Sequence, residues 1–260
     1  MNELHTHLFG PVDGPQLLAL HGLTGHGRRW EHLASQHLPH ARVLAPDLRG
    51  HGRSPWTPPW NFETHVRDLL TVLDAHAHAS GPVLVVGHSF GGALAVHLAA
   101  AAPERVRGLV LLDPAIGLPP ERMLEIAELT VQHPDYTDAA EARADKTNGS
   151  WGEVDPALLD AELAEHLVTL DSGRVNWRLC VPALVASWSE LAREFVLPPA
   201  HLPTIVARAA KVQPPYVTDE FRAALADRLG TNLTTLDLDC DHMIEQARPQ
   251  ETAALVRKLL

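Results

Sequence analysis

Cysteine is scarce in this sequence: among its 260 residues, only Cys180 and Cys240 carry a thiol. Two cysteines are too few for a disulfide framework, and both stand in apolar segments. We therefore expect two buried thiols in a protein of the reducing cytoplasm.

Positive charge is also limited. Lys and Arg total 21 against 32 Asp and Glu residues, which gives a formal net charge of −11. Proteins that bind nucleic acid or anionic membranes present clustered Lys and Arg side chains, and this sequence contains no such cluster. The charge balance therefore argues against both kinds of partner.

Long apolar runs are missing as well. No stretch reaches the roughly 18 apolar residues that a membrane-spanning helix needs. The first residues, MNELHTHLFG, have neither the basic region nor the apolar region of a signal peptide. We expect a soluble, cytoplasmic protein without an integral membrane segment.

What the sequence does contain is a series of short apolar runs that alternate with helical patterns. Apolar residues make up 45% of the chain, which is enough for a sizeable core. The runs are too short for helices, and their alternation with helices favours a mostly parallel α/β sheet with helices on both faces. The expected strands are residues 17–20, 42–45, 83–86, 106–112, 204–208 and 233–238.

The helical patterns have recognisable starts and stops. Asn61 is a typical N-cap residue, and from Val66 to Leu73 apolar residues recur on one face of the helix that follows it. Residues 91–101 predict a helix rich in small residues, which Pro103 would stop. Further helices are expected at residues 218–228 and 248–259.

Residues 116–200 break this alternation, because they contain helical segments, prolines and three tryptophans but no clear buried strand. A helical insertion between two strands of a parallel sheet would lie over the carboxyl edge, where ligands bind in open α/β folds. We expect residues 1–115 and 201–260 to form one core domain and residues 116–200 a helical cap. The alternative is a helical subdomain without a role in substrate binding.

The stretch from Gly87 to Gly91, GHSFG, fits the pattern G-x-S-x-G between a buried strand and a helix. At such a tight turn the Oγ of Ser89 points out at the top of the sheet, and the flanking glycines let neighbouring backbone approach. The backbone N–H of Phe90 lies at a helix start, where unpaired N–H groups favour negative charge. The motif predicts a serine nucleophile and one oxyanion donor.

With this motif the chain resembles serine hydrolases of the α/β-hydrolase fold, of the esterase and lipase kind. Three other stretches match the family, namely residues 21–25 (HGLTG), 46–54 (PDLRGHGRS) and 240–243 (CDHM). The resemblance implies that the backbone N–H of Leu23 is the second oxyanion donor. It also implies that the loop 46–54 braces the site and that His242 is the catalytic histidine.

The position of His242 agrees with this role, because it follows the last expected strand at the same sheet edge as Ser89. A general base must come within about 3 Å of the serine proton, and so must come from that edge. Among the other histidines, His21 is expected to order its loop by hydrogen bonds. His88, beside the nucleophile, is usually a packing residue and is otherwise a candidate for the substrate pocket.

The carboxylate that should orient the histidine is missing from its usual place. In most members of the family it follows the next-to-last strand, where this sequence has Lys211. A minority of the family carries the acid one strand earlier, and here Asp113 ends that strand. By this resemblance we expect a triad of Ser89, Asp113 and His242. A turn-capping role for Asp113, Asp219 as the acid, and the lack of a conventional acid stay open.

Aromatic residues in the cap suggest the substrate pocket. Trp151, Trp177 and Trp188 would give it apolar walls, together with His88, although tryptophans often only fill a core. No spacing of histidines and carboxylates resembles a zinc site, so we expect neither a metal nor a cofactor.

These residues and the resemblance predict an enzyme that hydrolyses carboxylic esters through an acyl-enzyme. Small-molecule esters with short- to medium-chain, apolar acyl groups are the expected substrates, monoacylglycerols among them. Alternatives on the same fold are C–C bond hydrolysis, a menaquinone-pathway-like lyase, a perhydrolase, and a ligand-binding protein without turnover. Nothing in the sequence predicts an oligomeric state.

Overall fold

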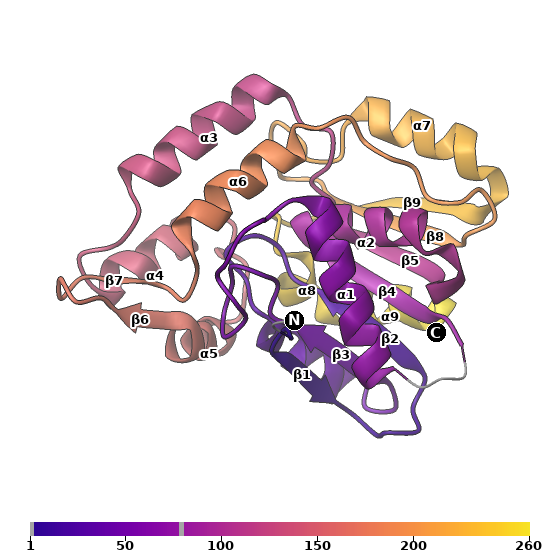
Figure 1. The fold of residues 1–260 in the computed structure, drawn as a ribbon, viewed down its shortest axis with the longest axis horizontal. Coiled ribbons are helices and arrows are strands. Elements are labelled where there is room, and N and C mark those ends of the chain that lie inside the picture. The colour runs from indigo at the N-terminus through magenta and orange to yellow at the C-terminus, as the bar shows by residue number, and fades with distance from the viewer. Residues whose placement is uncertain (1–2, 78–80) are drawn as a thin grey trace.

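A computed structural model describes residues 3–77 and 81–260, and within them a seven-stranded sheet forms the centre of the molecule (Figure 1). The strand order is β1-β3-β2-β4-β5-β8-β9; β1 is antiparallel to β3 and every other neighbouring pair is parallel. The strands are β1 (Thr6–Phe9), β2 (Gln16–Leu20), β3 (Arg42–Pro46), β4 (Val83–His88), β5 (Val106–Leu112), β8 (Thr204–Ala209) and β9 (Leu233–Leu238).

Both faces of the sheet are buried, which explains why its inner strands are almost continuously apolar. Along β2, Leu18 and Leu20 belong to the core cluster on one face, and Leu17 and Ala19 to the cluster on the other. Helices α1 (Phe62–His76), α2 (Phe90–Ala101) and α7 (Asp219–Leu229) supply the first cluster, and α8 (Ile244–Ala247) and α9 (Pro249–Leu259) the second. The predicted α/β class and the helices on both faces are confirmed.

The six expected strands lie where the apolar runs predict them, and the expected helices are α1, α2, α7 and α9. The side chain of Asn61 caps α1 by accepting a hydrogen bond from the backbone N–H of Thr64. Strand β1 has no counterpart in the sequence analysis, because this edge strand is only partly buried and has no apolar run. Cys240 is buried as expected, whereas Cys180 is half-buried; both thiols are free.

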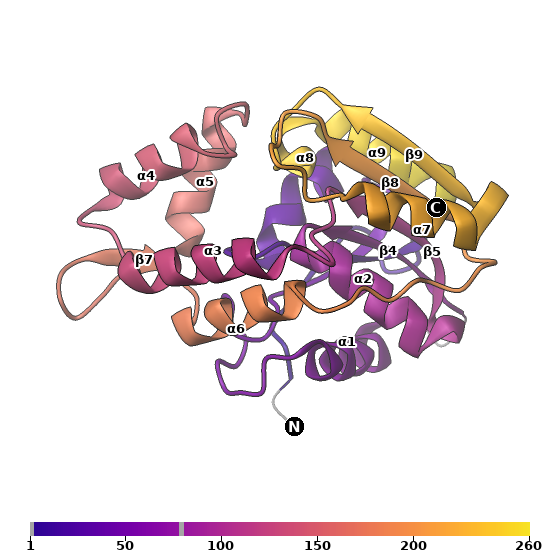
Figure 2. The same cartoon turned by 90° about the horizontal axis from the view of Figure 1, so that it is seen from above.

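The segment between β5 and β8 lies to one side of the sheet in both views (Figures 1 and 2). Its helices are α3 (Pro120–Gln132), α4 (Ala139–Asn148), α5 (Pro156–His166) and α6 (Val181–Leu191). The expectation of an all-helical segment was wrong, because strands β6 (Leu167–Thr169) and β7 (Val175–Trp177) form an antiparallel pair. Strands this short leave too brief a pattern to be recognised, and β6 continues directly from the helical pattern of α5.

The two ends of this segment meet next to the sheet. The backbone N–H of Leu118 donates a hydrogen bond to the carbonyl of Leu191, with a distance of 2.9 Å. Strands β5 and β8, which flank the segment in the sequence, pair directly in parallel. The carboxyl ends of β2, β4, β5 and β9 therefore meet at one edge of the sheet, and the loops that follow them carry the residues of the candidate site.

Candidate active site

Ser89 forms the whole turn between β4, which ends at His88, and α2, which begins at Phe90. Its backbone has φ +54° and ψ −119°, a conformation that L-residues rarely adopt. Gly87 and Gly91 are both needed, because a Cβ on Gly87 would collide with the backbone of Gly91 and a Cβ on Gly91 with that of Leu20. The sequence thus builds the tight strand–turn–helix geometry that the motif predicts.

Strained backbone gathers at this edge of the sheet. In the part of the chain that the structure describes, the non-glycine residues with positive φ are Thr24 (+61°), Ser89 (+54°) and Asp113 (+43°). They stand in the loops that follow β2, β4 and β5. Such conformations cost about 1–3 kcal/mol each and concentrate at functional sites, so they mark these three loops as the candidate site.

Asp113 and His242 are in direct contact, 2.6 Å apart between Oδ2 and Nδ1. Asp113 is fully buried, and its other oxygen, Oδ1, accepts a hydrogen bond from the backbone N–H of Ala209 at 3.1 Å. Because a carboxylate only accepts, the proton of the neutral imidazole lies on Nδ1, which leaves Nε2 free to act as a base. Asp219, the alternative acid, is an exposed residue in the first turn of α7.

His242 also lies next to the serine turn. The Nε2 of His88, the residue before Ser89, is 2.8 Å from the backbone carbonyl oxygen of His242. The two imidazole rings are 4.5 Å apart between centroids, and the ring of Tyr216 lies 4.4 Å from that of His242. The predicted Ser89, Asp113 and His242 therefore gather at one edge of the sheet.

The loop after β2 is ordered by hydrogen bonds to the carbonyl of Gly22. The Nδ1 of His21 and the backbone N–H of Gly25 both donate to the carbonyl of Gly22, at 2.8 and 3.1 Å. His21 Nε2 accepts from the backbone N–H of Leu48 at 2.9 Å, which fixes this tautomer and confirms the expected loop-ordering role.

The N–H of Leu23 belongs to the same peptide unit as the Gly22 carbonyl, so it points the opposite way. Within residues 3–77 and 81–260, neither this N–H nor that of Phe90 donates a hydrogen bond. A Cβ on Gly22 would lie 2.9 Å from the Cβ of Ser89, so this loop approaches the serine closely enough to require glycine. Two backbone N–H groups without a partner among the described residues therefore stand near Ser89, and their role as oxyanion donors stays a prediction.

The loop 46–54 is held by Asp47, whose oxygens accept from the backbone N–H groups of Gly27 and Arg53 at 2.7 and 2.8 Å. Burial alone would raise the pKa of Asp47, but these donors and His7 hold it well below its usual range. His5, His7 and Asp47 have ligand atoms within 4.8 Å of one another, the only metal-like group among the described residues. The backbone hydrogen bonds that Asp47 accepts explain its place in this group as a residue that braces the loop. The absence of a metal stays a prediction.

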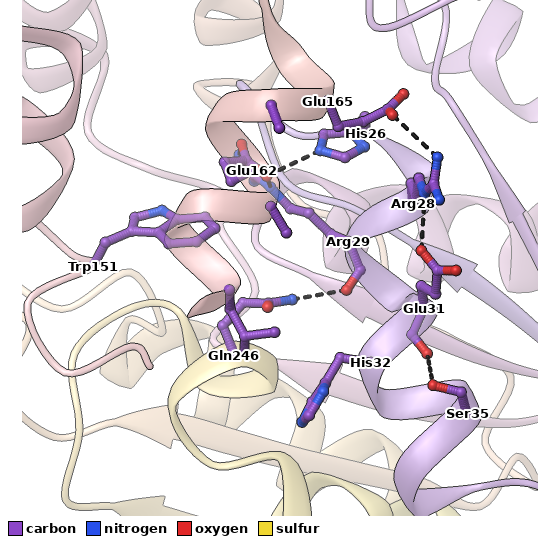
Figure 3. A pocket seen from close by; sticks show the side chains of 13 residues that line it. His26, Arg28, Arg29, Glu31, His32, Ser35, Trp151, Glu162, Glu165 and Gln246 are labelled. Atoms are coloured by element: carbon purple, nitrogen blue, oxygen red, sulfur yellow. Dashed lines mark hydrogen bonds and ion pairs between the residues drawn. The ribbon is translucent and has the colours of Figure 1, made fainter. Parts of the chain in front are cut away.

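The residues proposed for a substrate pocket do not share one cavity. Trp151 lines a cavity of about 500 Å³ (Figure 3), and Trp177 lines another of about 380 Å³ together with Trp56. Neither lining includes Ser89 or His242. Trp188 is half-buried and packs against two core clusters, and His88 is buried behind the serine turn.

A buried cluster of charges, not foreseen from the sequence, joins the segment between β5 and β8 to the rest of the molecule (Figure 3). Glu162 of α5 accepts from Arg29 at 3.0 and 2.5 Å and lies 2.9 Å from His26. It also lies 3.2 Å from Lys146 of α4, which Figure 3 does not draw. Burial alone would raise the pKa of Glu162, but Arg29 and the other neighbours hold it well below its usual range. Burial lowers the pKa of Lys146 to about 8.

Replacing Glu162 by Gln is expected to lower the free energy of unfolding by about 3–5 kcal/mol, because Arg29 and Lys146 would stay buried without their counter-charge. The matched control is Glu63→Gln, since Glu63 pairs with Arg193 at the surface, where the side chains are 59% and 43% exposed. The control should cost less than about 1 kcal/mol. Urea unfolding measures both, and equal losses would contradict the role of Glu162.

No helix among the described residues combines the length and the apolar character that crossing a membrane requires.

Comparison with known proteins gives the family. The model of the alpha/beta hydrolase family matches residues 17–255. Lipase LipV of Mycobacterium tuberculosis is 52% identical over 258 residues, which cover 99% of this chain and 98% of that protein. The sn-1-specific diacylglycerol lipase ABHD11 of Mus musculus is 33% identical over 68% of this chain and 59% of its own length.

A solved structure of a marine microorganism esterase superposes with a TM-score of 0.78 over 100% of both chains. Its sequence identity is 21%, so this likeness speaks to the fold alone. The family resemblance inferred from the motifs is confirmed: the chain belongs to the alpha/beta hydrolase family.

Proposed function

We propose that the protein is a carboxylic ester hydrolase in which Ser89 is the nucleophile, His242 the general base and Asp113 the acid that orients it. The contact of 2.6 Å between Asp113 and His242, beside the strained turn at Ser89, carries the proposal. The name of the relative that is 52% identical, a lipase, supports the same chemistry.

The reaction follows from these positions. Ser89 Oγ attacks the ester carbonyl carbon while His242 Nε2 takes its proton, and Asp113 stabilises the imidazolium through Nδ1–H. The tetrahedral intermediate collapses when His242 returns the proton to the leaving alcohol. Water then attacks the acyl-enzyme with His242 again as base, and the acid product leaves with Ser89 restored.

The backbone N–H groups of Leu23 and Phe90 would bind the oxyanion. Leu23 N–H is held in place through the Gly22 carbonyl, and Phe90 N–H stands at the N-terminus of α2, where the helix dipole adds to the effect. Because both groups are fixed by the fold, they need little reorganisation when charge develops on the substrate oxygen. A donor of this kind is typically worth about 10²–10³-fold in kcat.

We propose that residues 116–200 act as a cap that forms part of the acyl pocket. The cavity that Trp56 and Trp177 line has mainly apolar neighbours, among them Leu170, Leu179 and Val181. Ser89 and His242 do not line this cavity, so the proposed preference for esters with apolar acyl groups of short to medium length rests on the apolar side chains of the cap and not on a cavity joined to the nucleophile. The free thiols of Cys180 and Cys240 support a reducing, cytoplasmic location.

One observation favours an acidic substrate as a second candidate. The guanidinium of Arg122 lies 4.8 Å from the ring centroid of Tyr216, and that ring is 4.4 Å from the ring of His242. Arg122 makes no ion pair with the residues described, so it could receive a substrate carboxylate. Such a group is what a C–C bond hydrolase or a lyase of this fold would bind.

Hydrolysis of p-nitrophenyl esters tests the proposal, and we expect turnover that peaks at a short or medium acyl chain. The series should run from acetate to palmitate and include a hemiester with a free terminal carboxylate. A preference for the hemiester would favour the second candidate. Ligand binding without any turnover would contradict the ester hydrolase and favour a binding protein.

A further inference from the structure

Glu245 is a buried carboxyl group beside the candidate site that the proposed reaction does not use. It lies in the short helix α8, three positions after His242, and is 2% exposed. Its Oε1 is 3.3 Å from the Nδ1 of His88, and among the described residues neither that Nδ1 nor the Oε2 of Glu245 has a hydrogen-bond partner. A buried carboxylate with so few donors is costly, so the protonation of this pair needs an explanation.

The contacts of His88 determine its tautomer. Its Nε2 lies 2.8 Å from the backbone carbonyl oxygen of His242, and a carbonyl oxygen only accepts hydrogen bonds. Burial lowers the pKa of His88 well below its usual value, so its ring is neutral. The single proton of the ring therefore lies on Nε2, and Nδ1, which faces Glu245, is an acceptor.

An acceptor at this position selects the protonated form of Glu245. An ionised carboxylate would set lone pairs against the lone pair of Nδ1, whereas a carboxylic acid can donate its O–H to it. Burial raises the pKa of Glu245 to about 7, which agrees with this form. A proton on Glu245 would then let both donors point the same way, from Glu245 to His88 and from His88 to the carbonyl of His242.

The charges that face Glu245 come from three other elements. Arg29, before α1, favours the ionised form, whereas Glu162 of α5 and Asp113 after β5 oppose it. Arg29 is already bound to Glu162 by contacts of 3.0 and 2.5 Å. The guanidinium is therefore already paired with Glu162. The backbone N–H of Glu245 itself also favours the ionised form, and His88 is the side chain in contact with the carboxyl group.

We propose that Glu245 is a positioning residue that acts through His88: its protonated carboxyl group holds His88, and His88 holds the backbone of His242 in register with Ser89. This inference rests on the proposed function, since it assigns His242 as the base. Loss of the proton from Glu245 would break its contact with His88 and loosen the contact between His88 and the carbonyl of His242. The enzyme would then lose activity as the pH rises through the titration of Glu245.

Two substitutions at one position test the idea. The side-chain amide of Glu245→Gln can donate to His88 Nδ1 at every pH, whereas Glu245→Leu fills the space without a donor. We expect kcat to fall with pH above about 7 in the natural protein and not in Glu245→Gln. Glu245→Leu should have a kcat lower by about ten- to a hundredfold at all pH values, because a small displacement of the base is costly. Glu251→Gln, at an exposed acid in α9, is the matched control.

Thermal unfolding supplies a readout that does not depend on activity. The folded state holds the proton of Glu245 up to about pH 7, whereas an unfolded glutamate releases it near its ordinary pKa of 4.5. The contribution of the protonated Glu245 to the free energy of unfolding is therefore fully present below pH 4.5. It is lost as the pH rises through 7. The natural protein should lose Tm over this range relative to Glu245→Gln, while Glu251→Gln should follow the natural protein.

The outcomes separate the two proposals. An alkaline decline in kcat that persists in Glu245→Gln, or equal activity of the Gln and Leu variants, would overturn the positioning role. If the protein hydrolyses no ester, the proposed function fails. The Tm comparison and the imidazole ¹⁵N shifts of His88, expected to report a proton on Nε2, then still decide whether Glu245 holds His88. A proton on Nδ1 of a neutral His88 would refute the link.

Discussion

Replacing Ser89 by alanine is expected to lower kcat for ester hydrolysis by about 10⁴- to 10⁶-fold. The hydroxyl is the atom that forms the acyl-enzyme, and no other group at the turn can replace it. Ser89 has φ +54°, and alanine has the same Cβ without the hydroxyl, so the turn and the fold should be retained. The release of p-nitrophenol gives kcat, and circular dichroism and Tm confirm the fold.

The matched control is Ser187→Ala. Ser187 is also buried, and its hydroxyl donates only to the carbonyl of Ala183 within α6, at 2.8 Å. Its removal should leave kcat within a factor of about two, since helix back-bonding of this kind adds little. If the two alanine variants were equally active, Ser89 would not be the nucleophile and the proposed mechanism would be wrong.

The second large effect is expected at Asp113. Asp113→Asn should lower kcat by about 10⁴-fold, because an amide can donate to Nδ1 of His242 and so favour the tautomer with the proton on Nε2. That tautomer cannot accept the proton of Ser89. KM should change much less than kcat, since the imidazolium forms only as the reaction proceeds.

Asp219→Asn is the control that separates the two candidate acids. Asp219 is exposed in the first turn of α7, and its replacement should change kcat less than about twofold. Steady-state kinetics with one p-nitrophenyl ester measures both variants. A large loss at position 219 with near-natural activity of Asp113→Asn would show that the acid had been assigned to the wrong residue.

Much of the fold could be predicted because the inner strands are buried on both faces. Residues 83–86 and 106–112 are apolar at nearly every position, and such runs bounded by turns are recognisable in a single sequence. Strand β1 is a half-buried edge strand, and β6 and β7 have three residues each, so none of them leaves a comparable pattern.

The residues in and around the candidate site also differ in whether the sequence predicts them. Ser89 and His242 stand in short motifs at strand ends, and the family resemblance points to Asp113, which follows a strand, because Lys211 stands where most members carry the acid. Glu162 could not be predicted, because its partner Arg29 is 133 positions away and only the folded chain brings them together. Glu245 is close to His242 in sequence, but its burial against His88 becomes visible only in three dimensions.

The hydrogen bond between Leu118 and Leu191 has a consequence for how this architecture can diversify. The bond joins the two ends of the segment between β5 and β8 close to the sheet. For the sheet, this long segment therefore acts like a short connection between two paired strands. The entropy of closing a loop grows only with the logarithm of its length, and a longer or shorter excursion would change the stability of the sheet little. With the proposed role of this segment as a cap, substrate preference can therefore change through residues 119–190 while the loops that carry Ser89, Asp113 and His242 keep their places.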